Sequence, residues 1–153
     1  MNEEYLFGKL EIEQLDKALV LIRDVFYEYI ADEFSDEGVE EFMQFIEPSA
    51  IKDMLTQGKI HFWTCEDNGK VIGVLAGENS GYINLLFVNR QYHRKGVARR
   101  LLDMMIEQFN LSEITVKSSR YAVEIYRKLG FTETGGEQIV NGIRFIPMKR
   151  TRQ

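Results

Sequence analysis

The chain contains very little cysteine and histidine, and this shortage excludes whole classes of protein. Its 153 residues include one cysteine, Cys65, and two histidines. A single cysteine cannot form an intrachain disulfide, which excludes a disulfide-stapled secreted domain and fits a reducing cytoplasm. Two histidines and one cysteine cannot assemble a typical zinc site without carboxylates, and no ligand spacing points to a metal, so we expect none.

Long apolar runs are also missing. No run approaches the roughly 20 residues that a membrane span requires, so we expect no membrane partner. The first ten residues, MNEEYLFGKL, are acidic and lack the layout of a signal peptide. Aromatic residues nevertheless make up 12% of the chain, which argues against disorder because disordered chains are poor in large apolar side chains. The length is that of about one domain, and we expect a single cytoplasmic domain over residues 1–153.

Charge of one sign is missing from each of two stretches. Residues 24–47 contain nine acids and no base, whereas residues 90–100 contain five Arg or Lys residues, one His and no acid. The net charge of -5 argues against nucleic acid as a partner, because general nucleic-acid binding needs a broad basic surface. Either stretch could be a solvated face, but the basic one coincides with a turn that contains Gly96.

The first third of the chain predicts one strand followed by helices. Residues 5–12 alternate as a strand does, and residues 15–30 carry apolar side chains at helical spacing. Ser35 can cap a second helix. Pro48 either ends that helix or opens a short third one, which stops at Gly58.

The remaining two thirds predict a sheet with two more helices. Two Asn-Gly dipeptides, at residues 68–69 and 141–142, indicate tight hairpin turns because they readily adopt positive φ angles. The apolar run 82–88 suits a strand that is covered on both faces. The other segments are predicted as strands over residues 61–66, 70–77, 113–119, 131–140 and 143–149, and as helices over residues 97–109 and 121–129. Together these elements predict an α/β (α+β) fold, with a mixed central sheet flanked by helices.

The strand, loop and helix around Gly96 are the most informative part of the chain. A glycine at a helix start lets the backbone approach a ligand closely, since there is no Cβ in the way. The first amides of the helix have no partner within it, so with the helix dipole they favour an anion such as a pyrophosphate. Further charge would come from Arg94, Lys95, Arg99 and Arg100. The stretch lacks the three-glycine dinucleotide fingerprint and the lysine-ending phosphate loop, which disfavours hydride transfer and nucleotide hydrolysis.

Two motifs carry a resemblance to a known family. The stretch INLLFVNRQYHRKGVARRLLDMM resembles the acetyl-CoA motif Gln/Arg-x-x-Gly-x-Gly/Ala of the GNAT (GCN5-related) N-acetyltransferase superfamily, read here as residues 93–98. The later stretch SSRYAVEIYRKLGF, residues 118–131, is similar to that family's next helix. The resemblance implies the GNAT acyl-CoA N-acyltransferase fold and acetyl-CoA as the donor. It also implies that the donor contacts His93, Arg94, Lys95, Gly96, Val97, Ala98 and Arg99.

The sequence departs from the family pattern at two positions. His93 replaces the usual Gln or Arg, which would weaken one contact near the pyrophosphate or make it sensitive to pH. Lys117 stands where many relatives place an asparagine that contacts the cofactor. Neither change removes the backbone amides, which the resemblance implies hold most of the phosphate.

The resemblance also implies a mechanism of direct attack by an amine on the thioester. In the family the strand before the loop splays from the next strand, so that backbone groups of Leu86, Phe87 and Val88 would hold the pantetheine arm and face the thioester carbonyl. Tyr126 stands where relatives have the tyrosine that protonates the leaving sulfur, and its ordinary pKa of about 10 suits an acid. Ala122, four residues earlier, is small enough for the cofactor to pass. Tyr126 could instead be only a half-buried core residue.

The general base and the acceptor stay open at this point. The strand 82–88 has no carboxylate, so Asn84 or Tyr82 could hold a proton-relaying water, with Glu78 just upstream. Relatives place the acceptor cleft partly under the first two helices, where acids could attract a cationic amine. That would favour a polyamine, an aminoglycoside-like compound or a protein amine. These acids include Glu28, Asp32, Glu33 and Glu37.

Interpretations of the sequence other than an acetyltransferase also remain. Cys65 and His61 are about 13 Å apart if residues 61–66 form a strand, which is too far for a nucleophile–base pair. A non-catalytic acyl-CoA-binding sensor or assembly module would keep the donor site without turnover. A nucleotide-binding regulator is a third alternative. The acceptor, a small molecule or a protein, and the assembly, for which a homodimer is one option, are not determined by the sequence.

Overall fold

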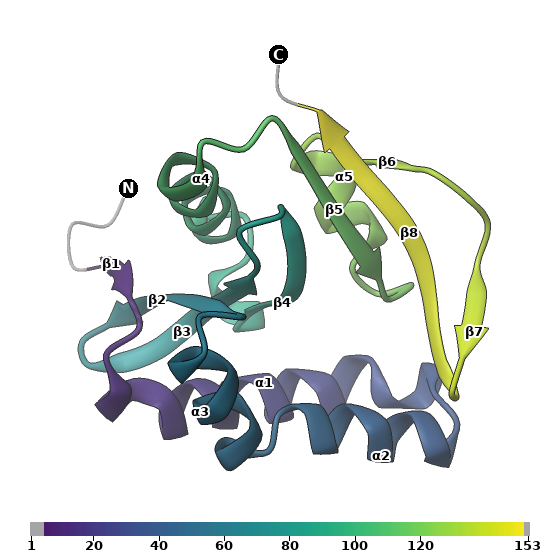
Figure 1. Cartoon of the computed structure of the whole chain (residues 1–153), viewed down its shortest axis with the longest axis horizontal. Coiled ribbons are helices and arrows are strands. Elements are labelled where there is room, and N and C mark those ends of the chain that lie inside the picture. The colour runs from purple at the N-terminus through teal and green to yellow at the C-terminus, as the bar shows by residue number, and fades with distance from the viewer. Residues whose placement is uncertain (1–4, 152–153) are drawn as a thin grey trace.

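In the computed structural model, which describes residues 5–151, an eight-stranded sheet carries helices on both faces (Figure 1). The strands are β1 Tyr5–Lys9, β2 His61–Asp67, β3 Lys70–Gly77, β4 Tyr82–Val88, β5 Glu113–Ser118, β6 Thr132–Glu133, β7 Gln138–Val140 and β8 Ile143–Thr151. The helices are α1 Leu15–Tyr29, α2 Asp36–Phe45, α3 Pro48–Thr56, α4 Val97–Phe109 and α5 Val123–Lys128. Short 3-10 turns are η1 Ile12–Gln14, η2 Ala31–Glu33 and η3 Arg90–Tyr92.

The sheet opens between its two central parallel strands. The strand order is β1-β2-β3-β4-β5-β8-β6, with β7 paired to β8. All pairs are antiparallel except β4 with β5, which are joined only through Tyr82 opposite Thr115 and Ile83 opposite Val116. Beyond Ile83 the two strands part, as the gap between their ribbons indicates (Figure 1). The predicted splay is therefore present, and it exposes one edge of β4.

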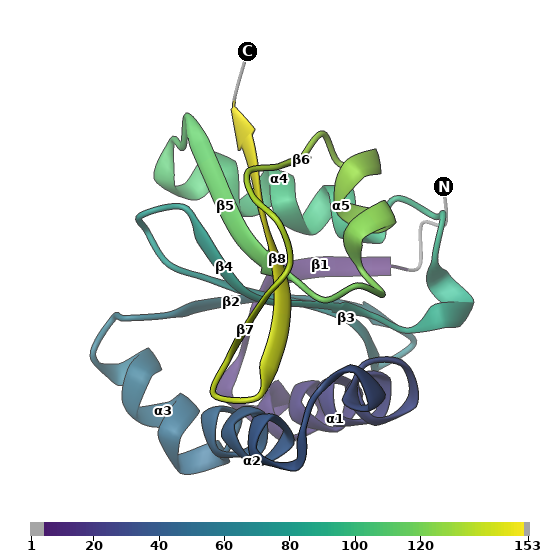
Figure 2. The ribbon, with the colours of Figure 1, turned by 90° about the vertical axis from the view of Figure 1, so that its right-hand side faces the viewer.

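Two apolar cores lie on opposite faces of the sheet, as the view along it makes clear (Figure 2). One core joins α1, α2 and α3 to β2–β4, and its fully buried side chains include Ile22 and Phe26. The other joins α4 and α5 to the opposite face, with Trp63, Leu101 and Met105 buried in it. This two-sided covering explains the nearly continuous apolar run of β4.

The helix boundaries follow from local chemistry. Ser35 accepts a hydrogen bond from the backbone N–H of Gly38 (3.3 Å) and so caps α2, as predicted. Pro48 opens α3 at its first turn, where a missing N–H costs nothing, and Gly58 follows its end with a φ of +71°. The alternative in which Pro48 opens a third helix is the correct one. Helix α5 is shorter than predicted because the chain up to Ala122 forms a turn, in which Ser119 Oγ accepts from the Ala122 N–H.

The predicted strand 131–140 is wrong in one respect, since it is broken into β6 and β7. The break contains Gly135 and Gly136, which have no side chains to pack, and the whole segment 132–141 is exposed. Both short strands pair with the long strand β8, whose other edge pairs with β5.

A close contact of backbones joins α2 to the hairpin of β7 and β8. The Gly142 carbonyl accepts a hydrogen bond from the Ser35 N–H (3.1 Å). A Cβ added to Gly38 would lie 2.1 Å from the Gly142 oxygen, so only glycine allows this approach. These segments are about 100 residues apart in the chain and meet at the lower right of Figure 1.

Candidate active site

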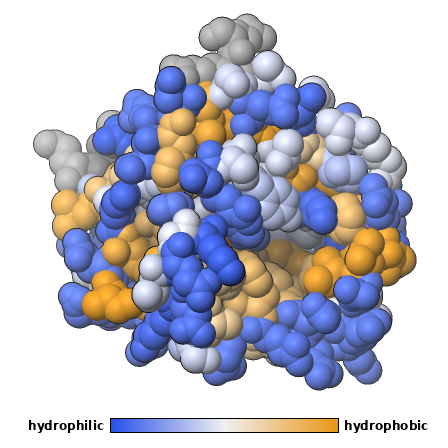
Figure 3. All heavy atoms as spheres, in the orientation of Figure 1, coloured by the Kyte–Doolittle hydropathy of each residue, from blue (hydrophilic) through white to orange (hydrophobic). Residues whose placement is uncertain are grey.

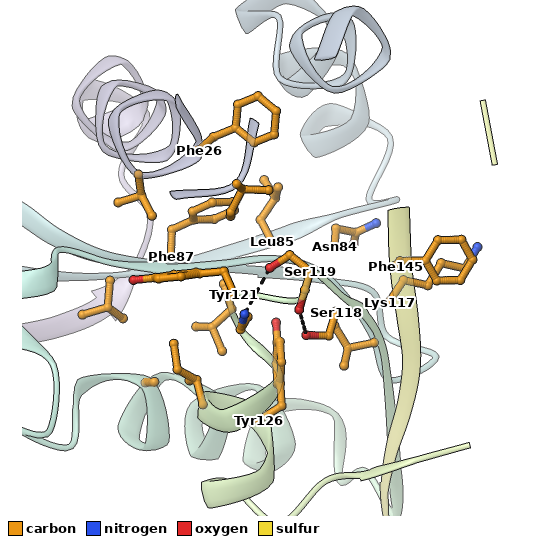
Figure 4. A pocket seen from close by; sticks show the side chains of 18 of the residues that line it. Phe26, Asn84, Leu85, Phe87, Lys117, Ser118, Ser119, Tyr121, Tyr126 and Phe145 are labelled. Atoms are coloured by element: carbon orange, nitrogen blue, oxygen red, sulfur yellow. Dashed lines mark hydrogen bonds between the residues drawn. The ribbon is translucent and has the colours of Figure 1, made fainter. Parts of the chain in front are cut away.

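A cavity of about 1040 Å³ follows the opening between β4 and β5. It runs from the loop before α4, past Tyr126 and Asn84, to aromatic side chains under α1 and α2 (Figure 4). Apolar side chains also show between hydrophilic ones in the lower half of the molecular surface (Figure 3). The opening between β4 and β5, the loop before α4 and the aromatic side chains therefore border one continuous cavity.

The loop that closes on α4 has the backbone of an anion cradle. Gly96 precedes the helix with a φ of +79°, and Arg94 is also left-handed with a φ of +65°. Left-handed residues at a helix start turn successive N–H groups toward one side, where they bind anions. A Cβ at Gly96 would meet no protein atom within 4 Å, so the space beside it is open to a ligand. Val97 is buried and Ala98 half-buried, and both line the cavity.

Most of the basic side chains near this loop already have partners. Arg99 donates to the Lys128 carbonyl at the end of α5 (2.7 Å), and the Arg100 guanidinium lies 5.5 Å from the Phe7 ring centre. Arg94 and Lys95 are exposed beside the cradle. They are the cations that are placed to approach a phosphate there.

His93 ties the loop to the end of β4. Its Nε2 lies 2.9 Å from the Val88 carbonyl oxygen, and since a carbonyl can only accept, Nε2 carries the proton. The side chain is half-buried. The predicted contact between His93 and the pyrophosphate would thus compete with this hydrogen bond.

The exposed edge of β4 offers backbone groups from alternate residues. The Asn89 N–H bonds the Ile72 carbonyl on β3 (2.8 Å), and antiparallel pairs that exchange hydrogen bonds recur every second residue. Phe87, two residues before Asn89, therefore bonds to β3 through its backbone. Leu86 and Val88 direct their backbone groups to the other side, into the splay. Of the three predicted residues, Phe87 contributes its side chain to the cavity, whereas Leu86 and Val88 contribute backbone groups.

Tyr126 stands on α5 at the centre of the cavity. It is 4% exposed, its ring packs edge-on against Phe131, and its hydroxyl points into the space between β4 and β5 (Figure 4). Burial, and to a smaller extent Tyr82, raises the pKa of Tyr126 above its ordinary value of 10. The hydroxyl is therefore protonated at neutral pH. Ala122 lies one turn earlier at the cavity wall, and its carbonyl accepts from the Tyr126 N–H (3.0 Å).

Asn84 lies where the strands begin to part. Its Nδ2 donates to Glu78 Oε2 (2.9 Å), which fixes the orientation of the amide because a carboxylate can only accept. Asn84 Oδ1 is then left buried with no hydrogen-bond partner in a residue that lines the cavity. Buried polar atoms are nearly always bonded, so this oxygen is a candidate acceptor for a ligand N–H. Tyr82, also at the cavity, has its pKa raised by burial and by Glu78.

The far end of the cavity is aromatic, which sequence reasoning missed. Phe26 stacks on Phe42 with ring centres 4.2 Å apart and meets Phe34 edge-on, and Phe42 approaches Phe87. These rings come from α1, the α1–α2 connection, α2 and β4, so no local motif could have revealed them. Helical periodicity placed Phe26 and Phe42 on apolar faces but did not show that these faces border a cavity.

The acids proposed to attract a cationic acceptor do not line the cavity. Glu28, Asp32 and Glu37 are exposed elsewhere. Glu33 instead accepts hydrogen bonds from the backbone N–H groups of Arg120 (2.8 Å) and Tyr121 (3.0 Å). It holds the η2 turn against the start of α5.

Cys65 and His61 are not a reactive pair. Both lie on β2, four residues apart, and Cys65 is fully buried, which raises the pKa of its thiol to about 12. His61 packs against Phe109, and burial lowers its pKa. Within residues 5–151 no cluster of three or more His, Cys, Asp or Glu side chains could hold a metal ion. In the same part of the chain, no helix has both the length and the apolar character of a membrane span.

Comparisons with known proteins agree with this geometry. A family model described as "Acetyltransferase (GNAT) domain" matches residues 30–152. The uncharacterized N-acetyltransferase YafP of Escherichia coli K12 is 31% identical over 98 residues, which are 64% of this chain and 61% of YafP. The match thus spans about three fifths of the length of that curated relative.

Solved structures share the fold over nearly the whole chain. A GCN5-related N-acetyltransferase from Rhodopseudomonas palustris, also described as "Aminotransferase, Class-II", aligns with a TM-score of 0.80 and 16% identity, covering 99% of this chain and 98% of that one. The PaiA N-acetyltransferase from Thermoplasma acidophilum, in complex with coenzyme A, aligns with a TM-score of 0.75 and 19% identity, covering 99% of both chains. These likenesses confirm the predicted fold.

Proposed function

Because the chain belongs to the GNAT acetyltransferase family, as its two motifs predict, we propose that it transfers an acetyl group from acetyl-CoA to an amine. The observation that supports this most strongly is the single cavity that joins the Gly96 cradle, the open edge of β4 and the Tyr126 hydroxyl. Acetyl-CoA, the donor that this family uses, supplies an activated acetyl thioester when it is bound.

The cradle and the open strand edge would bind the donor. The amides at the start of α4 take the pyrophosphate, aided by Arg94 and Lys95. The space beside Gly96 is open to a ligand, because a Cβ there would meet no protein atom within 4 Å. The backbone groups of Leu86 and the N–H of Val88 that face the splay hold the extended pantetheine arm as a missing strand would, while the Val88 carbonyl accepts from His93. An N–H on this edge faces the thioester carbonyl. A fixed N–H directed at the developing oxyanion typically contributes a few kcal/mol to the barrier reduction.

Asn84 would orient the attacking amine, and Tyr126 would protonate the leaving sulfur. The proton that the amine nitrogen loses passes to water, and Tyr126 regains its proton from water after CoA thiol has formed. Asn84 Oδ1, which has no partner of its own, accepts a hydrogen bond from the attacking amine, while Glu78 keeps the amide in this orientation. Tyr126 gives its proton to the departing sulfur, which its raised pKa permits at any pH near neutral.

Release of free CoA thiol, followed with acetyl-CoA and a panel of amines, tests the proposal. A time-dependent release that needs an amine, with the acetylated amine found by mass spectrometry, is the expected result. The rival is the non-catalytic acyl-CoA-binding sensor. It predicts tight acetyl-CoA binding by calorimetry and no release with any amine.

A further inference from the structure

The lining of the cavity is rich in cations, and the carboxylate nearest to Asn84 is that of Glu78, behind the amide. Of the described residues that line the cavity, only Glu124 has a carboxylate, and its side chain is paired with Arg127. Arg144 also lines this end, but it is bound to Glu137. Lys117 is different, because it is exposed and, within residues 5–151, its Nζ has only the face of the Phe145 ring, 5.1 Å from the ring centre, as a partner. A polycationic acceptor would meet the Lys117 ammonium, and the acid beside Asn84, Glu78, already accepts a hydrogen bond from that amide.

Lys117 stands opposite Asn84 at the point where the sheet opens. The last residues that pair β4 with β5 are Ile83 and Val116, so Asn84 and Lys117 are the next residues along the two parallel strands. Figure 4 shows the two side chains on the same side of the cavity, with Phe145 beside Lys117. An amine held by Asn84 would thus lie on the side of the cavity from which the Lys117 side chain extends, with its Nζ at the Phe145 ring.

The aromatic end of the cavity does not present the open ring faces that would bind a cation. A cation is bound by open ring faces, but the ring of Phe26 is stacked on Phe42 at an interplanar angle of 17° and has Phe34 against it. Apolar Ile30, Leu85 and Ile143 complete this part of the lining. Such a surface gains from burying an apolar or aromatic group.

We propose that the acceptor is an α-amino acid, or a compound built like one, with a large apolar or aromatic side chain. Asn84 takes the amine, Lys117 takes the adjacent carboxylate, and the rings around Phe26 and Phe42 take the side chain. This assignment rests on the proposed acetyl transfer. It replaces the polyamine-like acceptor that the acidic residues of α1 and α2 had favoured.

The test compares matched acceptors in wild type and in Lys117 variants. L-phenylalanine carries a carboxylate and an aromatic side chain beside its amine. Phenethylamine lacks only the carboxylate, and spermidine is a polycation. With wild type, kcat/KM for thiol release should be highest for L-phenylalanine and lowest for spermidine. In Lys117→Met the advantage of L-phenylalanine over phenethylamine should fall by roughly 2- to 5-fold, as for an ion pair at an exposed lysine. In Lys117→Glu the order of these two should reverse. Lys52→Glu, the same charge change on an exposed face of α3, should leave the order intact.

Binding of the products separates this inference from the proposed function. N-acetyl-L-phenylalanine should bind wild type in calorimetry and bind Lys117→Glu more weakly, whether or not turnover occurs. If it binds in this way but no amine releases thiol, acetyl transfer is wrong and the cavity assignment holds. Faster turnover with spermidine than with L-phenylalanine, or a preference that Lys117→Glu leaves unchanged, would overturn the acceptor assignment while acetyl transfer stands.

Discussion

The side-chain amide of Asn84 is held by Glu78 through a hydrogen bond of 2.9 Å, and its own carbonyl oxygen is left buried without a partner. The nitrogen must face the carboxylate, so the oxygen is the atom available to a ligand. Asn84 lines the cavity at the opening of the sheet, and this is where we propose that the attacking amine binds.

Replacing Asn84 with alanine should lower kcat/KM for thiol release by roughly 10-fold, as expected for one hydrogen bond to the reacting group. Acetyl-CoA affinity measured by calorimetry should stay the same, because the donor contacts lie elsewhere. Asn79→Ala, in the exposed turn between β3 and β4, is the matched control. An Asn84 variant with undiminished kcat/KM would show that the amine is bound without this oxygen.

Replacing Gly96 with valine should weaken acetyl-CoA binding by at least about 10-fold. The branched side chain would fill the open space of the cradle, and its φ of +79° is unfavourable for a β-branched residue. Gly58→Val separates these effects, since Gly58 has a similar φ of +71° and open space but lies outside the cavity. Calorimetry should show weakened acetyl-CoA binding in Gly96→Val and not in Gly58→Val. Equal loss in both would assign the effect to destabilisation of the fold.

Replacing Gly38 with alanine should destabilise the protein by about 1–3 kcal/mol, because the added methyl group would overlap the Gly142 backbone. Backbone atoms cannot turn aside as a side chain can, so α2 must shift away from the β7–β8 hairpin. Thermal unfolding measures the change. Gly136→Ala, which places its Cβ more than 4 Å from other atoms, should change stability by less than about 0.5 kcal/mol. Unchanged stability in the Gly38 variant would mean that this contact is not close in solution.

The sequence predicted the cavity lining around Gly96 and Tyr126 more fully than the aromatic lining under α1 and α2. The loop around Gly96 and the helix around Tyr126 are local motifs, and their backbone conformations depend on neighbouring residues. The Asn-Gly turns likewise have the positive φ angles that these residue types favour, with Asn68 at 51° and Asn141 at 52°. Local chemistry therefore determined most element boundaries.

The rest of the cavity lining depends on contacts between distant segments. Phe26 and Phe42 border a cavity only because the Gly38–Gly142 contact brings α2 against β8. Asn84 and Lys117 lie opposite each other because of the register in which β4 pairs with β5, and they border the cavity because that pairing stops after Ile83. The periodicity of apolar residues in a single sequence does not indicate where the hydrogen bonding between two strands ends. The same reason explains why residues 131–140 read as one strand, whereas β8 pairs with two separate pieces.

The pH dependence of turnover should have a rising limb and no falling limb below about pH 10. The amine attacks only after it loses its proton, so the rate rises as pH approaches the pKa of the acceptor. Burial raises the pKa of Tyr126 above 10, so the acid keeps its proton over this range. Steady-state rates from pH 6 to 10 measure both limbs. A fall in rate between pH 7 and 9, with the protein still folded, would identify a different acid.

The central claim is that Tyr126 protonates the sulfur that leaves during acetyl transfer, and Tyr126→Phe tests it most directly. The variant keeps the ring that packs against Phe131 and loses only the hydroxyl in the cavity. Acetyl-CoA affinity should be nearly unchanged, while kcat and kcat/KM should fall together by roughly 10²-fold, the lower end for a general acid because a thiolate is already a fair leaving group. Tyr27→Phe, exposed on α1, should behave as wild type. The measurement is the steady-state rate of thiol release with the best acceptor, beside a calorimetric titration of acetyl-CoA. Loss of turnover with intact donor binding is the predicted result, and a Tyr126→Phe variant with full turnover would contradict the account.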